Sequence, residues 1–275
     1  MLRSVVRQRA GAVSLAVLAA VALLAVLGPA LAPLDPLAQD ARAVLQGPSP
    51  AHWLGTDNLG RDVASRLLAG STLSLVAALE AVAAGLVLGV VPGLLSVLLG
   101  RTFEWVTLRV VDALVTLPFL VFAVAMTALL GNGLHQAMLA VGILIAPAFY
   151  RVTRAAAFPL VGAPFVEAAQ LAGATPWFVL RRHVWPTVLP AVAVSTAGLL
   201  GSSLVIVSSL TFLGIGVQPP APTWGGMLAT DLLFLFQRPW GPLAPALLIV
   251  LAVGACHGLA DALRDATAPR EAVRA

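Results

Sequence analysis

Long apolar runs dominate the sequence, and shorter polar segments separate them. A helix needs about 20 apolar residues to cross the roughly 30 Å hydrocarbon core of a bilayer, and most of these runs reach that length. Six spans are predicted, at about residues 10–34, 72–99, 109–130, 134–150, 188–213 and 242–260. The pattern therefore predicts an all-α membrane protein with six transmembrane helices.

The first run has a second interpretation, because a secretory signal peptide also combines basic residues with an apolar stretch. Residues 1–9 contain three arginines, and residues 30–32 (Ala-Leu-Ala) resemble a cleavage site. The run is longer than the about 7–15 residues of a signal core, however, and Pro33 directly follows the site. We therefore predict a cytoplasmic N-terminus at residues 1–9 and a retained helix at residues 10–34.

The composition agrees with a membrane protein and leaves little chemistry for catalysis. Of the 275 residues, 60% are hydrophobic and 10% are charged, whereas soluble domains have about 25% charged residues. The mean hydropathy is +0.97. The sequence has no lysine, which excludes the usual phosphate-binding loop and Schiff-base enzymes, and its single cysteine has no partner for an internal disulfide. We predict no catalytic residue, no metal site and no cofactor in this chain, so any energy source would lie on a partner.

The arginines predict the orientation of the spans. With the N-terminus inside, twelve of the 16 arginines fall in inner segments and four in outer segments, as the positive-inside rule requires. Both termini are then cytoplasmic. The predicted parts after the first helix are an external loop at residues 35–71, a five-helix core at residues 72–264 and a cytoplasmic tail at residues 265–275. The core contains a long cytoplasmic loop at residues 151–187.

Residues 165–186 form the one long segment that is neither continuously apolar nor rich in turn residues. Pro164 and Glu167 suit the first turn of a short helix, where a missing amide hydrogen is harmless and negative charge is favourable. Gly173 would end that helix, because glycine reaches positive φ without strain. Threonine and proline at 175–176 would cap and open a second helix. The segment predicts two short helices joined by a glycine turn.

This segment resembles the coupling loop of ABC importer permeases, in which a Glu-Ala-Ala motif is followed by a glycine and a basic helix. In that family the loop docks into a groove of the cytoplasmic ATPase subunit. The residues that match and would carry the coupling are Glu167, Ala168, Ala169, Gly173, Trp177, Arg181, Arg182 and Pro186. On the second helix, Trp177, Leu180 and Val184 are predicted to share one face. The alternative is an amphipathic loop that lies on the membrane surface.

Two external segments carry longer motifs. Residues 52–62 read HWLGTDNLGRD and residues 214–227 read GIGVQPPAPTWGGM, both rich in turn residues. They resemble the permeases of the dipeptide, oligopeptide and nickel branch, although Trp53 stands where that branch usually has proline. The residues expected to face a binding protein are Gly55, Asp57, Arg61, Asp62, Gln218 and Trp224. A structured loop without contact to the substrate is the alternative.

Few polar residues interrupt the spans. Small residues recur every four positions through residues 77–93, which predicts the close approach of another helix. Glu80 lies about a third of the way into this predicted span, where a carboxylate usually faces a partner or water. Ser195, Ser202 and Ser209 recur at heptad spacing in the fifth span, where they either line a pathway or serve helix packing.

The resemblance covers roughly residues 52–270 and implies a type I ABC importer permease, a multi-pass protein of the bacterial inner membrane. It further implies a heterodimer with a related permease, two ATPase subunits that hold ATP and Mg²⁺, and an extracytoplasmic binding protein, with no role for nucleic acid. The expected substrates are di- or oligopeptides or a related solute such as a nickel complex. The alternative function is a proton- or ion-coupled secondary transporter that uses Glu80, although such folds tend to show paired broken spans, which the sequence lacks.

Overall fold

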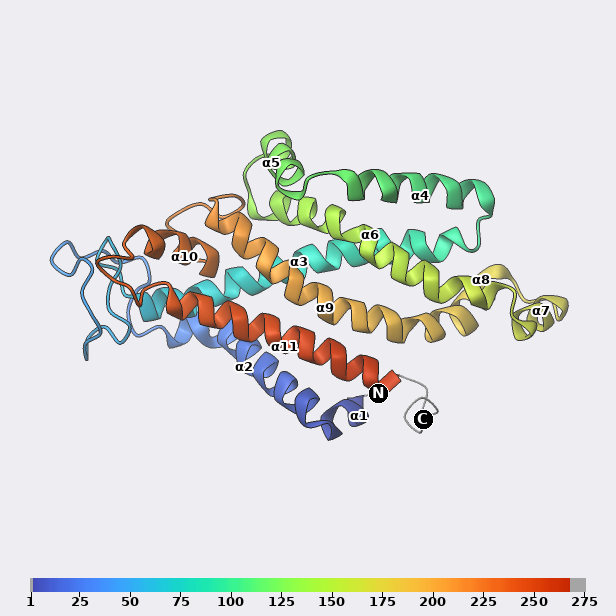
Figure 1. Ribbon diagram of the computed structural model, residues 1–275, viewed down its shortest axis with the longest axis horizontal. Helices are drawn as coiled ribbons and strands as arrows, with labels where there is room; N and C mark the ends of the chain where they lie inside the picture. Colours follow the sequence, from blue (N-terminus) through green and yellow to red (C-terminus); the bar gives the residue numbers. More distant parts are fainter. Residues whose placement is uncertain (1, 268–275) are drawn as a thin grey trace.

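The computed structural model describes residues 2–267. Five long helices run through that range and lie side by side along the long axis of the molecule (Figure 1): α2 (Arg9–Leu31), α3 (Val63–Ser96), α6 (Leu134–Val161), α9 (Trp185–Phe212) and α11 (Leu243–Thr267). Each is long and apolar enough to cross a membrane. The shorter helices are α1 (Leu2–Arg7), α4 (Arg101–Thr116), α5 (Phe119–Leu130), α7 (Pro164–Leu171), α8 (Pro176–Val179), η1 (Leu180–Val184) and α10 (Trp224–Leu233). The all-α prediction is confirmed for the described residues.

The remaining predicted span is bent. Helices α4 and α5 together pass the length and hydropathy test, but they meet at 101°. The break falls at residues 117–118, because Pro118 disfavours a helical conformation of the residue before it and has no amide hydrogen to donate. The described residues thus contain five continuous candidate spans and one bent span, where the sequence predicted six.

The centre of the bundle is the contact between α3 and α6, and glycines make it close. A Cβ atom at Gly89 of α3 would lie 2.6 Å from the Cβ of Phe149, and one at Gly142 of α6 would lie 2.5 Å from the Cβ of Ala84. Gly93 continues the contact to Thr153, one turn further along both helices. The order of these pairs shows that α3 and α6 run in the same direction. The predicted helix-packing role of the small residues at 77–93 is therefore confirmed.

Two helix boundaries differ from the predicted ones. Helix α3 begins at Val63 rather than near residue 72, because the carboxylate of Asp62 accepts the amide hydrogen of Ser65 at 2.8 Å and caps the helix. Helix α6 extends to Val161 rather than ending near residue 150. The arginines at 151 and 154 do not open a loop; they pair with Asp112 and Glu104 of α4, so the helix accommodates their charge.

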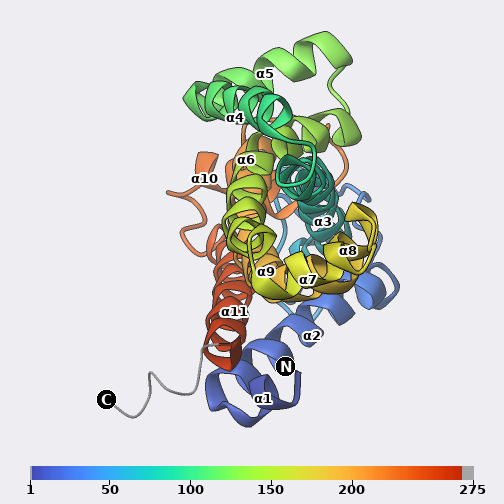
Figure 2. The same cartoon turned by 90° about the vertical axis from the view of Figure 1, so that its right-hand side faces the viewer.

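The two ends of the bundle carry different elements. Figure 1 shows α7 and α8 at one end, whereas residues 32–62 and α10 lie at the other. Viewed from the α7 end, α3, α6 and α9 occupy the middle, α4 and α5 lie on one side, and α2 and α11 lie on the other (Figure 2). The arginine distribution assigns the α7 end to the cytoplasm and residues 32–62 to the outside.

This orientation can be tested with single cysteines in a Cys256→Ser background. Ala51 and Gln218 are exposed at the external end, and Ala172 is exposed at the α7 end. Ala51→Cys and Gln218→Cys should react with a membrane-impermeant thiol reagent in intact cells, whereas Ala172→Cys should react only after the membrane is opened. Labelling of Ala172→Cys from outside would overturn the orientation.

Candidate functional site

The segment that joins α6 to α9 forms the predicted pair of short helices. Gly173 follows α7 with φ of +88°, and the Ala174 amide donates to the Ala169 carbonyl at 3.0 Å, which closes the turn. The Thr175 hydroxyl accepts the Phe178 amide hydrogen at 3.3 Å and caps α8. Because these contacts are local in sequence, the pattern alone could predict them.

One side of the helix pair is buried and the other is open. The buried side consists of four aliphatic side chains, Val166, Val179, Leu180 and Val184. The open side has Leu171 at 91% exposure and Trp177 at 65%, with Arg181 and Arg182 also exposed. Such a surface, apolar with a basic margin, is suited to a partner protein or a membrane surface.

The predicted coupling residues do not all lie on the same side. Glu167, Ala168, Gly173 and Pro186 are exposed, and Ala169 is half-buried. The predicted shared face of the second helix is only partly observed, since Leu180 and Val184 are buried whereas Trp177 is exposed. A π-helical turn at η1 shifts the register and joins the second helix directly to α9, so Pro186 lies in the first turn of α9.

Trp177 nevertheless lies beside a groove. A cavity of about 390 Å³ separates α3 from the η1 segment, and its lining includes Leu86, Val90, Leu94, Trp177, Leu180 and Trp185. The helix pair thus borders the cytoplasmic half of α3 as well as joining α6 to α9.

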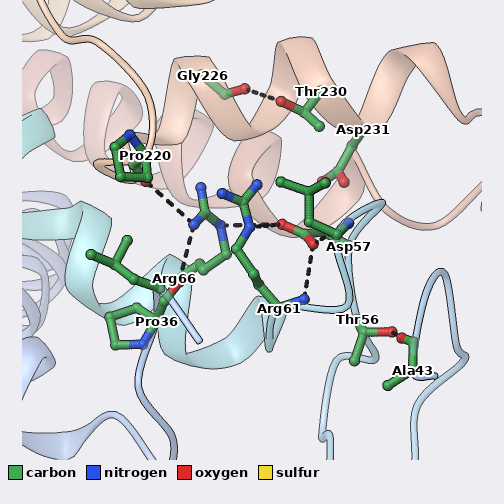
Figure 3. Close-up of polar contacts among 12 residues, drawn as sticks. Pro36, Ala43, Thr56, Asp57, Arg61, Arg66, Pro220, Gly226, Thr230 and Asp231 are labelled. Carbon is green, nitrogen blue, oxygen red and sulfur yellow. Dashed lines mark hydrogen bonds and ion pairs between the residues drawn. The ribbon is translucent and has the colours of Figure 1, made fainter. Parts of the chain in front are cut away.

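At the other end, ion pairs hold the external loop together. The carboxylate of Asp57 lies 2.7 Å from Nε of Arg61 and 3.4 Å from Nε of Arg66, and it also accepts the backbone amide of Arg61 at 3.0 Å. Figure 3 shows both guanidinium groups beside Asp57, with Asp231 of α10 nearby. Arg66 also donates to the Pro36 carbonyl at 3.0 Å. These contacts join the start of α3 to the external loop that precedes it.

Arg238 extends this cluster to the segment after α10. It is 2% exposed and donates to the carbonyl oxygens of Thr56 and Leu54 at 2.8 and 2.6 Å, while its Nη1 lies 3.8 Å from Asp231. Burial raises the pKa of Asp231 above its ordinary value, and Arg238 only partly opposes that shift. Burial likewise lowers the pKa of Arg238. Arg238 is therefore the clamp between α10 and residues 54–56.

Most of the external residues expected to face a partner are buried. Asp57, Arg61, Asp62 and Trp224 are at most 6% exposed, and Gly55 is also buried. Of the six, Gln218 alone is exposed. The motif builds the interior of the external loop, and direct contact with a binding protein through the five buried residues is not compatible with this packing.

No role was predicted from the sequence for Arg66, Asp231 or Arg238. The sequence does show these three charged residues in otherwise apolar segments. Such a charge must find a partner when the segment folds back on the protein. The contact of Arg238 with Thr56 spans 182 positions, so the local sequence does not show it.

Two family models match the chain. Residues 81–273 match the model described as "Binding-protein-dependent transport system inner membrane component", and residues 1–48 match the "N-terminal TM domain of oligopeptide transport permease C". The chain belongs to the binding-protein-dependent ABC permease family. It is accordingly an inner-membrane permease, as predicted.

Curated relatives of the permease come from the same branch. It is 37% identical over 225 residues to the glutathione transport system permease protein of Pectobacterium atrosepticum, which covers 82% of this chain and 75% of the relative. It is 35% identical over 248 residues to the probable D,D-dipeptide transport system permease protein of Escherichia coli strain K12, which covers 90% and 83%. These relatives confirm the predicted peptide-permease branch.

A solved structure supports the fold assignment. The permease is similar to a chain of a methionine ABC transporter in an inward-facing conformation, with a TM-score of 0.60 and 20% identity. The match covers 74% of this chain and 97% of the other. The similarity concerns the fold and confirms the predicted type I importer architecture.

Inside the spans, the permease places the predicted polar residues in different surroundings. Ser202 and Ser209 donate to the carbonyls one turn earlier, at 3.3 and 2.9 Å, so their hydroxyls are satisfied within α9. Ser195 is half-buried. Glu80 instead pairs with a residue of another helix: the Nδ1 of His135 lies 2.8 and 3.0 Å from its two oxygens. Helix α3 begins earlier than predicted, so Glu80 lies midway along it rather than a third of the way in.

Loss of Arg238 and loss of Asp231 should destabilise the external loop by different amounts. Arg238→Ala leaves the carbonyls of Thr56 and Leu54 without this donor and the buried Asp231 without its ion-pair partner, which should cost about 3–5 kcal/mol, as for a broken buried pair. Asp231→Asn removes a carboxylate that burial already disfavours, so it should cost less than about 1 kcal/mol. Thermal unfolding of the purified permease and protease cleavage within residues 32–62 measure both effects.

Arg42→Ala is the matched control, since Arg42 is the external arginine outside this cluster and its side chain is exposed. It should leave both the unfolding temperature and the cleavage rate unchanged. Equal destabilisation by Asp231→Asn and Arg238→Ala would contradict the assignment of Arg238 as the clamp.

Proposed function

We propose that this permease forms, with a related permease subunit, the translocation path of an ATP-driven importer for short peptides or peptide-like solutes. The family assignment and the names of its relatives, which include glutathione and D,D-dipeptide systems, support this substrate class. Peptides are favoured over nickel complexes, because neither of these relatives is named for a metal.

The proposed coupling element is the helix pair of α7 and α8. A docking element has to project from the membrane domain, expose apolar side chains and keep a fixed shape. The pair projects at the end of the molecule in Figure 1, exposes Leu171, Trp177 and Phe178, and is held by the glycine turn and the Thr175 cap. Each of two ATPase subunits, which carry ATP and Mg²⁺, would receive one such pair in its groove.

The helix pair of α7 and α8 is joined directly to the long helices α6 and α9, which supports a role in transmitting movement to them. Helix α6 ends at Val161 and two residues separate it from α7, while η1 joins α8 to α9 without a break. Movement of the docked pair on ATP binding would therefore act on α6 and α9 together. The alternative function, proton coupling at Glu80, lacks a comparable role for this exposed pair.

The external segments would meet the binding protein through their exposed residues. Five of the six expected contact residues are buried, whereas Gln218, Trp53 at 65% exposure and Phe236 at 99% exposure are accessible at the external end. In this proposal the ion cluster gives that surface a constant shape. The substrate arrives with the binding protein, and this chain supplies no catalytic group.

Gly173→Leu tests the coupling proposal. A leucine at φ of +88° costs about 1–2 kcal/mol of backbone strain, and a Cβ there meets no atom within 4 Å. The variant should therefore insert and accumulate as the wild type does, while substrate uptake by the assembled transporter is lost. Binding-protein stimulation of ATP hydrolysis, measured in proteoliposomes, should be lost as well.

Gly162→Leu provides the matched control in the same loop. Gly162 also has open space around its Cβ position, but its φ of −97° suits any residue. The control should retain both uptake and stimulated ATP hydrolysis. Normal uptake and stimulation in Gly173→Leu would mean that the helix pair is not the coupling element.

A further inference from the structure

The Glu80–His135 pair lies deep in the membrane-spanning part. Helix α2 has 23 residues, which makes it about 34 Å long, close to the thickness of a bilayer core. The hydroxyl of Ser71 in α3 donates to the Leu24 carbonyl of α2 at 2.8 Å, which fixes the two helices side by side. Since Glu80 is nine residues further along α3 than Ser71, it lies roughly 20–25 Å from the outer end of α2.

A second contact gives the same depth. The Ser203 hydroxyl of α9, nine residues before that helix ends at Phe212, donates to the carbonyl of Ala78, two residues before Glu80, at 3.3 Å. The pair therefore lies within the membrane-spanning part of the bundle and not at its surface.

The pair is nevertheless open to its surroundings in this subunit. The side chains of His135 and Glu80 are 80% and 32% exposed, respectively. Along α3, an exposed stripe passes the pair, and its members are Val76, Leu79, Ala83, Val87 and Val91. An ionisable pair at this depth is expensive in lipid and is stable where it faces protein or water.

The turn that precedes α6 lies close to this pair in the sequence. Gly131 and Asn132, three to four residues before His135, are exposed and non-helical, and nothing lies within 4 Å of the Gly131 Cβ position. The Asn132 side chain accepts the Gly216 amide hydrogen at 2.8 Å, which fixes this turn. The ionisable pair therefore needs protein or water on this face of the subunit, and the exposed turn next to it leaves space there.

The chemistry of the pair selects a cation. A carboxylate accepts about four hydrogen bonds, and His135 supplies one donor, so Glu80 keeps acceptor capacity. A carboxylate beside an imidazole has a net charge of zero or minus one. An ammonium group brings three donors and a positive charge, which match what Glu80 still lacks.

We propose that Glu80 and His135 form a hydrated cation-binding position midway along the translocation path, which takes the ammonium group of an amino-acid-derived substrate. This inference rests on the proposed importer function for the path and the substrate. It assigns Glu80 to contact with the substrate and His135 to holding the carboxylate in place.

The test measures charge selectivity at a cysteine beside the pair in the complete transporter. Ala83→Cys in a Cys256→Ser background places a thiol on the exposed stripe, three residues from Glu80. In proteoliposomes, a cationic methanethiosulfonate should modify this thiol about five- to tenfold faster than an anionic one of similar size. Adding Glu80→Gln should bring the ratio close to one.

Glu104→Gln in the same background is the control, because it removes the carboxylate of a different interhelical ion pair. It should leave the rate ratio unchanged. A thiol that reacts with neither reagent would show that lipid or the second permease covers the stripe, and a ratio that Glu80→Gln does not alter would show that Glu80 does not select cations. Either result overturns the proposal.

Uptake of an alanyl dipeptide and of its N-acetyl derivative provides the second measurement. Glu80→Gln should raise the KM for the free dipeptide about tenfold and leave uptake of the acetylated one unchanged, whereas a merely structural role would change both alike. If the wild-type transporter takes up neither peptide, the proposed substrate class fails, while the charge ratio still decides whether the cation position exists.

Discussion

The close contact between α3 and α6 is the constraint on which the rest of the structure depends. Glycines on both helices let the backbones approach, and side chains larger than hydrogen at Gly89 or Gly142 would separate them. Because lipid gives helices no hydrophobic reason to associate, such packing is a main source of stability between spans. The contact also fixes register: the external ion cluster begins at the start of α3, and the helix pair follows the end of α6. The contact between α3 and α6 therefore connects the external loop at one end of the molecule to the helix pair at the other.

The external loop uses ion pairs where a larger domain would use an apolar core. About 30 residues between α2 and α3 cannot bury enough apolar surface to fold alone, and here the carboxylates of Asp57 and Asp231 organise three arginines instead. Such pairs are weak evidence for stability, but the loss of Arg238 would leave the buried Asp231 without its partner.

Local features of the sequence were predictable, and distant pairings were not. The turn at Gly173, the Thr175 cap and the glycine repeat of α3 depend on residues a few positions apart, so the pattern alone carries them. The sequence also shows Pro118, but a continuous apolar run around it hid the 101° bend between α4 and α5. The motif at residues 52–62 was recognised, although its burial was not, because burial depends on α10 and on Arg238, more than 170 positions away.

The pairing of Glu80 with His135 illustrates the same limit and also a physical requirement of transport. The two residues lie 55 positions apart, so the sequence showed a costly carboxylate without showing what satisfies it. A binding position inside a path has to attract a substrate without holding it. A bare carboxylate in a narrow, weakly polar space would bind an ammonium group tightly and release it slowly. An imidazole that already occupies part of its acceptor capacity lowers that attraction, and it can resume its contact when the substrate leaves. In the proposed path, His135 would thus weaken the binding of the ammonium group to Glu80 enough for the substrate to be released.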